Sequence, residues 1–434
     1  MSRNKGTTVE AVLTNLFPSA KLRKTAVDAG VVTRRRKVDV VAFFWTLVLG
    51  FGVAKHRTLA GLRRTYENRT SMKIEESSFY DRFTPKMAKW LRGIVGEALE
   101  HVTTDSRRLA DRLSGFRDLL LIDSTVIRLH ELLRGSFAGC RTNHTKAAAK
   151  LHVVMSVKDA SPARIQLTPE RTNDRSPWRR VGGWVRDTLM LFDLGYFGYA
   201  LFTRIDENGG FFISRLKANA NPVVVAQNRQ WRGQSRPVVG KRLRDAVDGL
   251  QREVLDVMVE VTFDRRAYRG CRRRDTRSFR VVGVLDDVTG EYHLFVTNIP
   301  VERLDGHEVA STYRLRWQIE LLFKEMKSHY RLDQLPSRKR HVVETLLYAA
   351  ILTLIASHAL LDALRRRLGA GRSIPPLRWA AVFDALAPGL LVAVLATFTR
   401  PRPHEDPWLL LLSQATDPNL ARPSALVGRI AYAA

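Results

Sequence analysis

Two short apolar runs that each end in an aspartate constrain the fold of this chain more than any other feature. The runs are LLLID, from Leu119 to Asp123, and LMLFD, from Leu189 to Asp193. Each has the length and composition of a buried strand. Two such strands bring both aspartates to one edge of a sheet, which is where α/β proteins build their sites. An aspartate after a strand can also simply cap the next turn, so a structural role stays open for each.

Further strand-like segments surround these runs. LHVVMSV and ARIQLT follow the first run at hairpin spacing, GFFISRLK follows the second, and VLDVMVEVTF, VVGVLDD and EYHLFVTNI come later in the chain. A polar region separates GFFISRLK from the later segments and indicates an insertion. We therefore predict three regions: a helical DNA-binding domain at residues 1–112, an α/β domain at 113–335 with a β-rich insertion at about 219–280, and C-terminal helices with a tail at 336–434.

The first hundred residues have helical periodicity and few strand-like runs. Two short amphipathic segments within them, Thr58 to Tyr66 and Ser77 to Leu91, are separated by a polar linker. They fit a helix-turn-helix DNA reader. They fit an ordinary helical hairpin about as well, because no tight glycine turn marks the motif.

Two apolar stretches approach the length of a membrane span. They cover residues 38–54 and 345–361, about 17 residues each, which is the lower limit for crossing a bilayer. Asp39 and His358 interrupt their edges. We predict that both are buried core helices and that the protein has no membrane partner.

The charge of the chain favours a polyanionic partner. It has 71 Lys and Arg against 43 Asp and Glu, a formal net charge of +28, and each phosphate that such cations neutralise releases a condensed counterion. Ribosomal and membrane-surface proteins are also basic, so the charge alone does not identify a function. One segment, residues 264–280, holds eight arginines and two aspartates interleaved with Tyr268 and Phe279. A solvated hairpin tip would explain the segment, but phosphate contact explains it better.

Only two cysteines occur, Cys140 and Cys271, and neither lies in a Cys/His cluster. This spacing argues against a structural zinc site and against a disulfide framework. It favours a reducing compartment, and we expect the protein in the cytoplasm, at the nucleoid.

The segment from Glu308 to Tyr330, EVASTYRLRWQIELLFKEMKSHY, contains no glycine or proline and is predicted to be one helix. At 100° per residue, the side chains of Tyr313, Arg316, Glu320 and Lys327 fall on one narrow stripe beside the apolar face. Arg316 and Glu320 also form an i,i+4 pair, which would stabilise any exposed helix by only about 0.2–0.5 kcal/mol. A site that binds a metal through the carboxylate and phosphates through its neighbours requires all of these groups.

The spacing Tyr313-x2-Arg316-x3-Glu320-x6-Lys327 resembles the Y-(2)-R-(3)-E-(6)-K signature of transposases of the insertion-sequence-four family. LLLIDST and LFDLGYF resemble the family's segments with the first and second aspartates, and FFISRLK its following strand. The resemblance implies an RNase H-like core, with Asp123, Asp193 and Glu320 as both the catalytic and the metal-binding residues. Two Mg²⁺ ions are implied, with Mn²⁺ as a substitute; carboxylate oxygens suit either ion.

The resemblance also implies a DNA transposase that cleaves at the ends of an insertion sequence and transfers the strands into target DNA by cut-and-paste transposition. Its partners are then double-stranded DNA, as terminal inverted repeats and as target, and a second subunit in a homodimeric synaptic complex. Trp231 is a candidate for stacking on a flipped base. We assign DNA contacts to Tyr313, Arg316, Lys327, Arg215, Arg272, Arg273 and Arg274. Two alternatives stay open: a catalytically silent DNA-binding protein derived from a transposase, and another RNase H-like nuclease.

Overall fold

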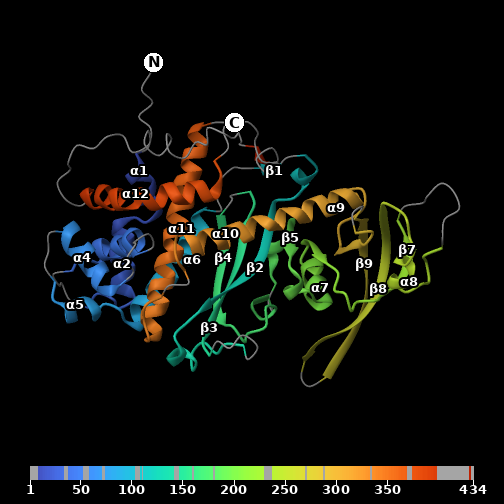
Figure 1. Cartoon of the computed structure of the whole chain (residues 1–434), viewed down its shortest axis with the longest axis horizontal. Helices are drawn as coiled ribbons and strands as arrows, with labels where there is room; N and C mark the ends of the chain where they lie inside the picture. The colour runs from blue at the N-terminus through green and yellow to red at the C-terminus, as the bar shows by residue number, and fades with distance from the viewer. Residues whose placement is uncertain are drawn as a thin grey trace, which may run out of the picture.

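The computed structural model of the chain describes residues 8–33, 38–51, 58–70, 74–102, 108–109, 111–140, 146–158, 161–178, 181–228, 237–268, 271–286, 289–332, 335–368, 374–397 and 430–431. Within these residues the centre of the molecule is a nine-stranded mixed sheet of order β4-β3-β2-β5-β6-β10-β9-β8-β7 (Figure 1). A separate two-stranded pair joins β1 (Arg108–Leu109) to β11 (Ile430–Ala431).

The first five strands of the large sheet form its α/β core. They are β2 (Asp118–Arg128), β3 (Ala148–Ser156), β4 (Ser161–Pro169), β5 (Thr188–Phe192) and β6 (Phe211–Arg215). The pairs β2·β3 and β3·β4 are antiparallel, whereas β2·β5 and β5·β6 are parallel. This is the strand order of an RNase H-like core, and the predicted fold class is confirmed.

The insertion continues the same sheet. It contains β7 (Val223–Gln227), the short helix α8 (Leu243–Val247), β8 (Val254–Tyr268) and β9 (Cys271–Leu285), and β10 (Tyr292–Thr297) follows it. β10 pairs with both β6 and β9 and so joins the insertion to the core. The hairpin of β8 and β9 projects beyond the other strands (Figure 1).

One strand prediction was wrong in length. β2 does not end at Asp123 but continues for five residues, to Arg128. The reason is its partner on the other side: β5 has ended by then, but β3 pairs with β2 from Leu120 to Arg128. Asp123 therefore lies in the middle of a strand.

Helices cover both faces of the sheet. On one face α7 (Tyr199–Glu207) packs against β6 and β8. On the other face α10 (Trp317–Ser328) packs against β2, and α11 (Arg340–Leu368) and α12 (Pro376–Ala396) pack against α10. The N-terminal helices surround α11 and α12 and share one hydrophobic core with them: α1 (Val9–Leu16), α2 (Ser19–Asp28), α3 (Val40–Trp45) with its π-helical extension η1 (Thr46–Phe51), α4 (Leu59–Thr70), α5 (Glu76–Tyr80) and α6 (Pro85–Val102).

Both apolar stretches that approach membrane length form core helices in the described residues. Phe43, Phe44 and Trp45 are at most 1% exposed. Two described helices, α11 and α12, are long and apolar enough to cross a membrane, but 89% of the apolar window of α11 and 50% of that of α12 are buried inside the protein. Packing within the protein thus accounts for the apolar surface of α11.

The predicted segment from Ser77 to Leu91 is two helices rather than one. It breaks at residues 81–84, between α5 and α6. Thr84 accepts a hydrogen bond from the backbone N–H of Met87, and Pro85 occupies the first position of α6, where its missing N–H costs nothing.

Candidate active site

Strand alternation places the two aspartates on one face of the sheet. In β2, Leu119 and Leu121 point to the core that contains α10, whereas Leu120 and Ile122 point to the opposite core. By the same alternation, Asp123 points to the side of α10. Leu189 and Leu191 of β5 also face α10, so Asp193, two residues after Leu191, points to that side as well. The parallel register pairs Ile122 with Phe192, so Asp123 in β2 comes next to Asp193, the residue after β5.

Glu320 comes from the helix that covers this face. The predicted single helix is three segments: α9 (Gly306–Tyr313), a 3-10 turn η8 (Arg314–Arg316), and α10, with Glu320 in its first turn. A capping box between Asp305 and Glu308 fixes the start of α9. The tighter turn shifts the angular positions expected for a regular helix, yet Tyr313 and Arg316 still contact residues of the sheet.

Arg316 joins two of the three acidic side chains. Its Nη1 lies 3.3 Å from Oδ2 of Asp123 and its Nη2 lies 2.6 Å from Oε1 of Glu320. The side chains of Arg316 and Asp123 are each 17% exposed, and that of Glu320 is 34% exposed. The Tyr313 hydroxyl donates a hydrogen bond to the carbonyl of Phe192, at 3.1 Å, and thus ties α9 to the residue before Asp193.

The remaining predicted DNA contacts lie at varying distances from this cluster. Lys327 is half-buried in the last turn of α10, about two turns beyond Glu320. Arg215 is exposed at the end of β6. Burial raises the pKa of the Tyr313 hydroxyl to about 12, and the positive charge of Arg215 opposes part of this rise. The stripe from Tyr313 to Glu320 therefore meets the two aspartates, with Arg215 nearby.

The carboxylate of Asp123 lies in an environment that disfavours its charge. Burial is the main cause, and the neighbouring charges of Asp193 and Glu320 add to it, so that the pKa of Asp123 rises to about 6. A hydrogen bond from the backbone N–H of Ser124, at 2.7 Å, and the charge of Arg316 oppose the rise without cancelling it. Above pH 6 the Asp123 carboxylate is therefore charged at a cost in free energy.

This shift predicts a pH-dependent stability difference for Asp123→Asn. The folded-state pKa lies above the ordinary value, so the proton of Asp123 stabilises the fold fully below pH 4, and this contribution is lost as pH rises through 6. A shift of about two units corresponds to roughly 2–3 kcal/mol. With divalent ions chelated, urea denaturation should find the variant more stable than the parent by about that amount at pH 7.5 and equal to it near pH 4. Equal stability at both pH values would contradict the prediction.

A divalent cation fits this cluster in donor chemistry and in charge. The three side chains offer only carboxylate oxygens, which Mg²⁺ prefers. A bound cation would offset the cost of burying the Asp123 charge, the main cause of its raised pKa, and the smaller repulsion from Asp193 and Glu320. Among the described residues, however, no three acidic, histidine or cysteine side chains surround one point closely enough to hold an ion as they lie. The Arg316 guanidinium stands between Asp123 and Glu320, so metal binding requires that it move.

A fourth carboxylate beside the cluster was missed in the sequence. Asp174 accepts a hydrogen bond from Ser124 Oγ at 3.2 Å and pairs with Lys150 at 2.9 Å. Gly195, two residues after Asp193, lets the Asp174 carboxylate come this close. A Cβ at that position would stand only 3.2 Å from Oδ2 of Asp174. The segment RTNDRSPW around Asp174 has no strand or helix pattern, and only the fold reveals its place.

An exposed aromatic residue was missed as well. Trp317 follows Arg316 directly, and its side chain is 57% exposed. On a helical wheel it falls beside the polar stripe and away from the apolar face, a signal that the sequence already contains. Trp231, which we considered for base stacking, lies outside the described residues.

The arginine-rich segment divides into residues with different environments. Arg274 is exposed on β9, and the side chains of Arg272 and Arg273 lie outside the described residues. Arg280 is 2% exposed and pairs with Asp256 at 2.6 Å, so it is structural and cannot contact a phosphate. The expectation that the whole segment serves DNA was wrong for this residue.

Comparisons with known proteins agree on one family. A family model described as "Transposase DDE domain" matches residues 114–356. The chain is 21% identical over 318 residues to the transposase for insertion sequence element IS231F of Bacillus thuringiensis subsp. israelensis, a match that covers 66% of each chain. It is 20% identical over 368 residues to the transposase for insertion sequence element IS1151 of Clostridium perfringens, covering 79% of this chain and 78% of that one.

The matched region spans just under two thirds of the IS231F transposase, at 66% of its length. It likewise spans 65% of the transposase for insertion sequence element IS231E of Bacillus thuringiensis subsp. finitimus, to which the chain is 19% identical over 311 residues. A solved structure of the piggyBac transposase synaptic complex with hairpin DNA aligns with 98% of this chain and 89% of that chain. The TM-score of that alignment is 0.46 at 9% sequence identity.

Proposed function

The chain belongs to the family of transposases with a DDE domain, and from this we propose that it catalyses Mg²⁺-dependent cleavage at the ends of an insertion sequence and strand transfer into target DNA by cut-and-paste transposition. The observation that carries the proposal is the convergence of Asp123, Asp193 and Glu320 on one face of an RNase H-like sheet. The matching relatives are transposases of insertion sequences, which supports the same substrate class.

Each residue of the site has a role that follows from its chemistry. Asp123, Asp193 and Glu320 would hold the metal ions, which when bound activate the attacking hydroxyl group and stabilise the leaving oxygen. Arg316, released from the two carboxylates, can grip a phosphate bidentately. Trp317 offers an exposed indole on which an unpaired base can stack.

Tyr313 orients the site rather than reacting in it. Its hydroxyl is engaged with the carbonyl of Phe192, and its ring lies 5.9 Å from the guanidinium of Arg316. It thus fixes the helix and the arginine relative to Asp193. We propose that Lys327, Arg215 and the exposed Arg274 contact DNA phosphates farther along the duplex, as Arg272 and Arg273 would from the same strand.

The protein's setting follows from the same proposal. Its partner is double-stranded DNA, both as terminal inverted repeats and as target, and joining two ends in one synaptic complex calls for a homodimer. The N-terminal helices are the proposed DNA-binding domain, and the working compartment is the cytoplasm at the nucleoid. A net charge of +28 supports a nucleic-acid partner.

The test is cleavage of duplex DNA that carries the ends of the element, with a second duplex present as target. We expect nicks at the ends that require Mg²⁺ or Mn²⁺, followed by products in which the freed 3′-hydroxyl is joined to the target. Tight end binding without cleavage would favour the catalytically silent DNA-binding protein. Cleavage without joined products would favour another RNase H-like nuclease.

A further inference from the structure

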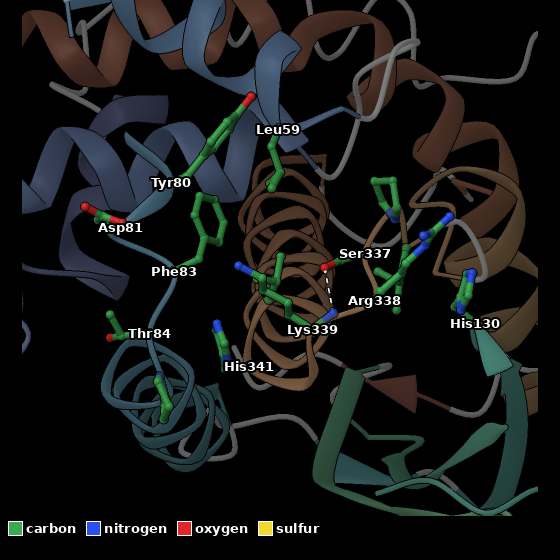
Figure 2. Close-up of a pocket in the computed structure, with 14 residues that line it drawn as sticks. Leu59, Tyr80, Asp81, Phe83, Thr84, His130, Ser337, Arg338, Lys339 and His341 are labelled. Atoms are coloured by element: carbon green, nitrogen blue, oxygen red, sulfur yellow. Dashed lines mark hydrogen bonds between the residues drawn. The ribbon is translucent and has the colours of Figure 1, made fainter. Parts of the chain in front are cut away.

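A groove of about 700 Å³ lies where three parts of the molecule meet, away from the carboxylate cluster. Figure 2 shows its walls: the chain between α5 and α6 on one side, the start of α11 in the middle, and the turn after β2 on the other side. Cationic side chains gather at the start of α11. The side chains that matter for its chemistry are Tyr80, Asp81, His130, Arg338, Lys339 and His341.

The groove carries an excess of positive charge. Arg338 and Lys339 are exposed, and neither side chain forms an ion pair or hydrogen bond with any residue that the structure describes. Asp81 is the acidic residue among the described residues that line the groove. Two further acids nearby are already neutralised, because Glu131 pairs with Lys146 at 2.7 Å and Glu344 pairs with Arg340 at 2.8 Å.

Strand β2 connects the proposed active site to one wall of the groove. β2 leads from Asp123 to Arg128, and His130 follows two residues later. At about 3.3 Å per residue, these seven residues span roughly 20 Å. On the other side, α10 carries Glu320 and ends at Ser328, ten residues before Arg338 in the chain. Since B-DNA rises 3.4 Å per base pair, a separation of about 20 Å corresponds to roughly six base pairs.

We propose that this groove binds the phosphate backbone of the duplex whose end lies at the carboxylate cluster, about six base pairs from the cleaved bond. The inference rests on the proposed function and adds a second contact site to it. Arg338 and Lys339 neutralise the phosphates, Arg338 in a bidentate manner and Lys339 as a point charge. Phosphate contacts of this kind fix the position of the duplex and read no sequence.

The test compares duplex binding by the full-length protein and by Arg338→Gln/Lys339→Gln. The probes are a labelled 40-base-pair duplex that carries the element's end and a duplex cut to about four base pairs beyond the cleavage point. Loss of two phosphate contacts should weaken binding of the long duplex roughly 30-fold at 0.15 M salt and reduce the slope of log K against log salt by about 1.8. On the short duplex the variant should equal the parent.

The matched control is Arg366→Gln/Arg367→Gln. These two arginines are exposed near the other end of α11 and carry the same charge, roughly 40 Å along the helix axis from the groove. We expect their substitution to leave the length dependence unchanged. Asp81→Asn removes the acidic residue of the lining and should tighten binding of the long duplex about twofold. Melting temperatures of all variants verify folding.

The outcomes separate this inference from the proposed function. If the parent protein binds no duplex at all, the proposed function fails and the groove proposal fails with it. If the parent binds but the Arg338→Gln/Lys339→Gln variant matches it in affinity and salt slope on the long duplex, only the groove proposal is overturned. A deficit of equal size on both duplexes also overturns it, because the contact would then not lie beyond the cleavage point.

Discussion

Glu320→Gln is expected to lower Mg²⁺-dependent DNA cleavage by about 10³-fold or more while duplex binding stays within about threefold of the parent. Glutamine keeps the size of the side chain, and its amide oxygen can still accept the hydrogen bond that Arg316 now donates at 2.6 Å. What it removes is the negative charge that a metal ion requires. A charge-only change therefore tests the chemistry of the site without removing its architecture.

The matched control is Glu344→Gln on α11. Glu344 pairs with an arginine four residues earlier at 2.8 Å, as Glu320 does at 2.6 Å, but it lies away from the carboxylate cluster. Its substitution should leave cleavage unchanged. Full cleavage by Glu320→Gln, measured on duplexes that carry the element's ends, would remove Glu320 from the proposed triad. Equal losses in both variants would attribute the effect to helix stability instead of metal binding.

Asp123→Asn combines opposite effects on activity and stability. It should abolish cleavage for the same reason as Glu320→Gln, yet stabilise the metal-free fold near neutral pH, because burial raises the pKa of the carboxyl to about 6. Sites that must hold several like charges are commonly less stable than their neutralised variants. A stabilised but inactive variant would thus be the signature of a metal-binding carboxylate.

The sequence predicts the core of this fold because its signals are local. Leu119 to Ile122 and Leu189 to Phe192 are buried strand residues, as their composition indicates. Asp193 directly follows its strand, whereas Asp123 lies within its own. The signature from Tyr313 to Lys327 lies on helical turns, although these are the end of α9, a 3-10 turn and α10 and not the one helix predicted. The relatives confirm the resemblance to insertion-sequence transposases. The fold class needed no information about distant contacts.

What the sequence did not reveal depends on partners far along the chain. β2 extends beyond Asp123 because β3 pairs with its second half, and no local pattern announces that pairing. Asp174 reaches the site from an irregular segment, 50 residues from its hydrogen-bond partner Ser124. The position of Arg316 between two carboxylates likewise depends on a contact 193 residues apart, with Asp123. Such contacts follow from the tertiary fold and leave no periodic trace.

Arg280 shows the same limit within a charged segment. Residues 264–280 look uniformly basic, and Arg274 and Arg280 are six residues apart in β9, so that they point to the same face of the sheet. Arg274 is nevertheless exposed in the projecting part of the hairpin, whereas Arg280 is buried beside Asp256. Composition alone cannot distinguish an arginine that faces solvent from one with a buried acidic partner 24 residues away.

Arg280→Met is expected to lower the free energy of unfolding by about 3–5 kcal/mol. The Arg280 guanidinium donates two hydrogen bonds to Asp256, at 2.9 and 2.6 Å, and two more to the carbonyls of Ile299 and Leu304, at 3.0 and 2.7 Å. Arg280 is 2% exposed and Asp256 is 5% exposed. Methionine fills much of the volume but leaves a buried carboxylate without its cation and two carbonyls without donors, which urea denaturation will detect.

Two further variants establish that the buried partner causes the loss. In Arg280→Met/Asp256→Leu both charges are gone, so the part of the loss that comes from the unpaired carboxylate should return. The carbonyls of Ile299 and Leu304 still lack their donors, so recovery should be partial. Arg274→Met removes an exposed arginine from the same strand and should change stability by no more than about 0.5 kcal/mol.

Leu304 precedes Asp305, the N-cap of α9, so the loss of Arg280 should also loosen the helix that positions Tyr313. If Arg280→Met is as stable as Arg274→Met, this ion pair does not hold the insertion to the helix of the proposed active site.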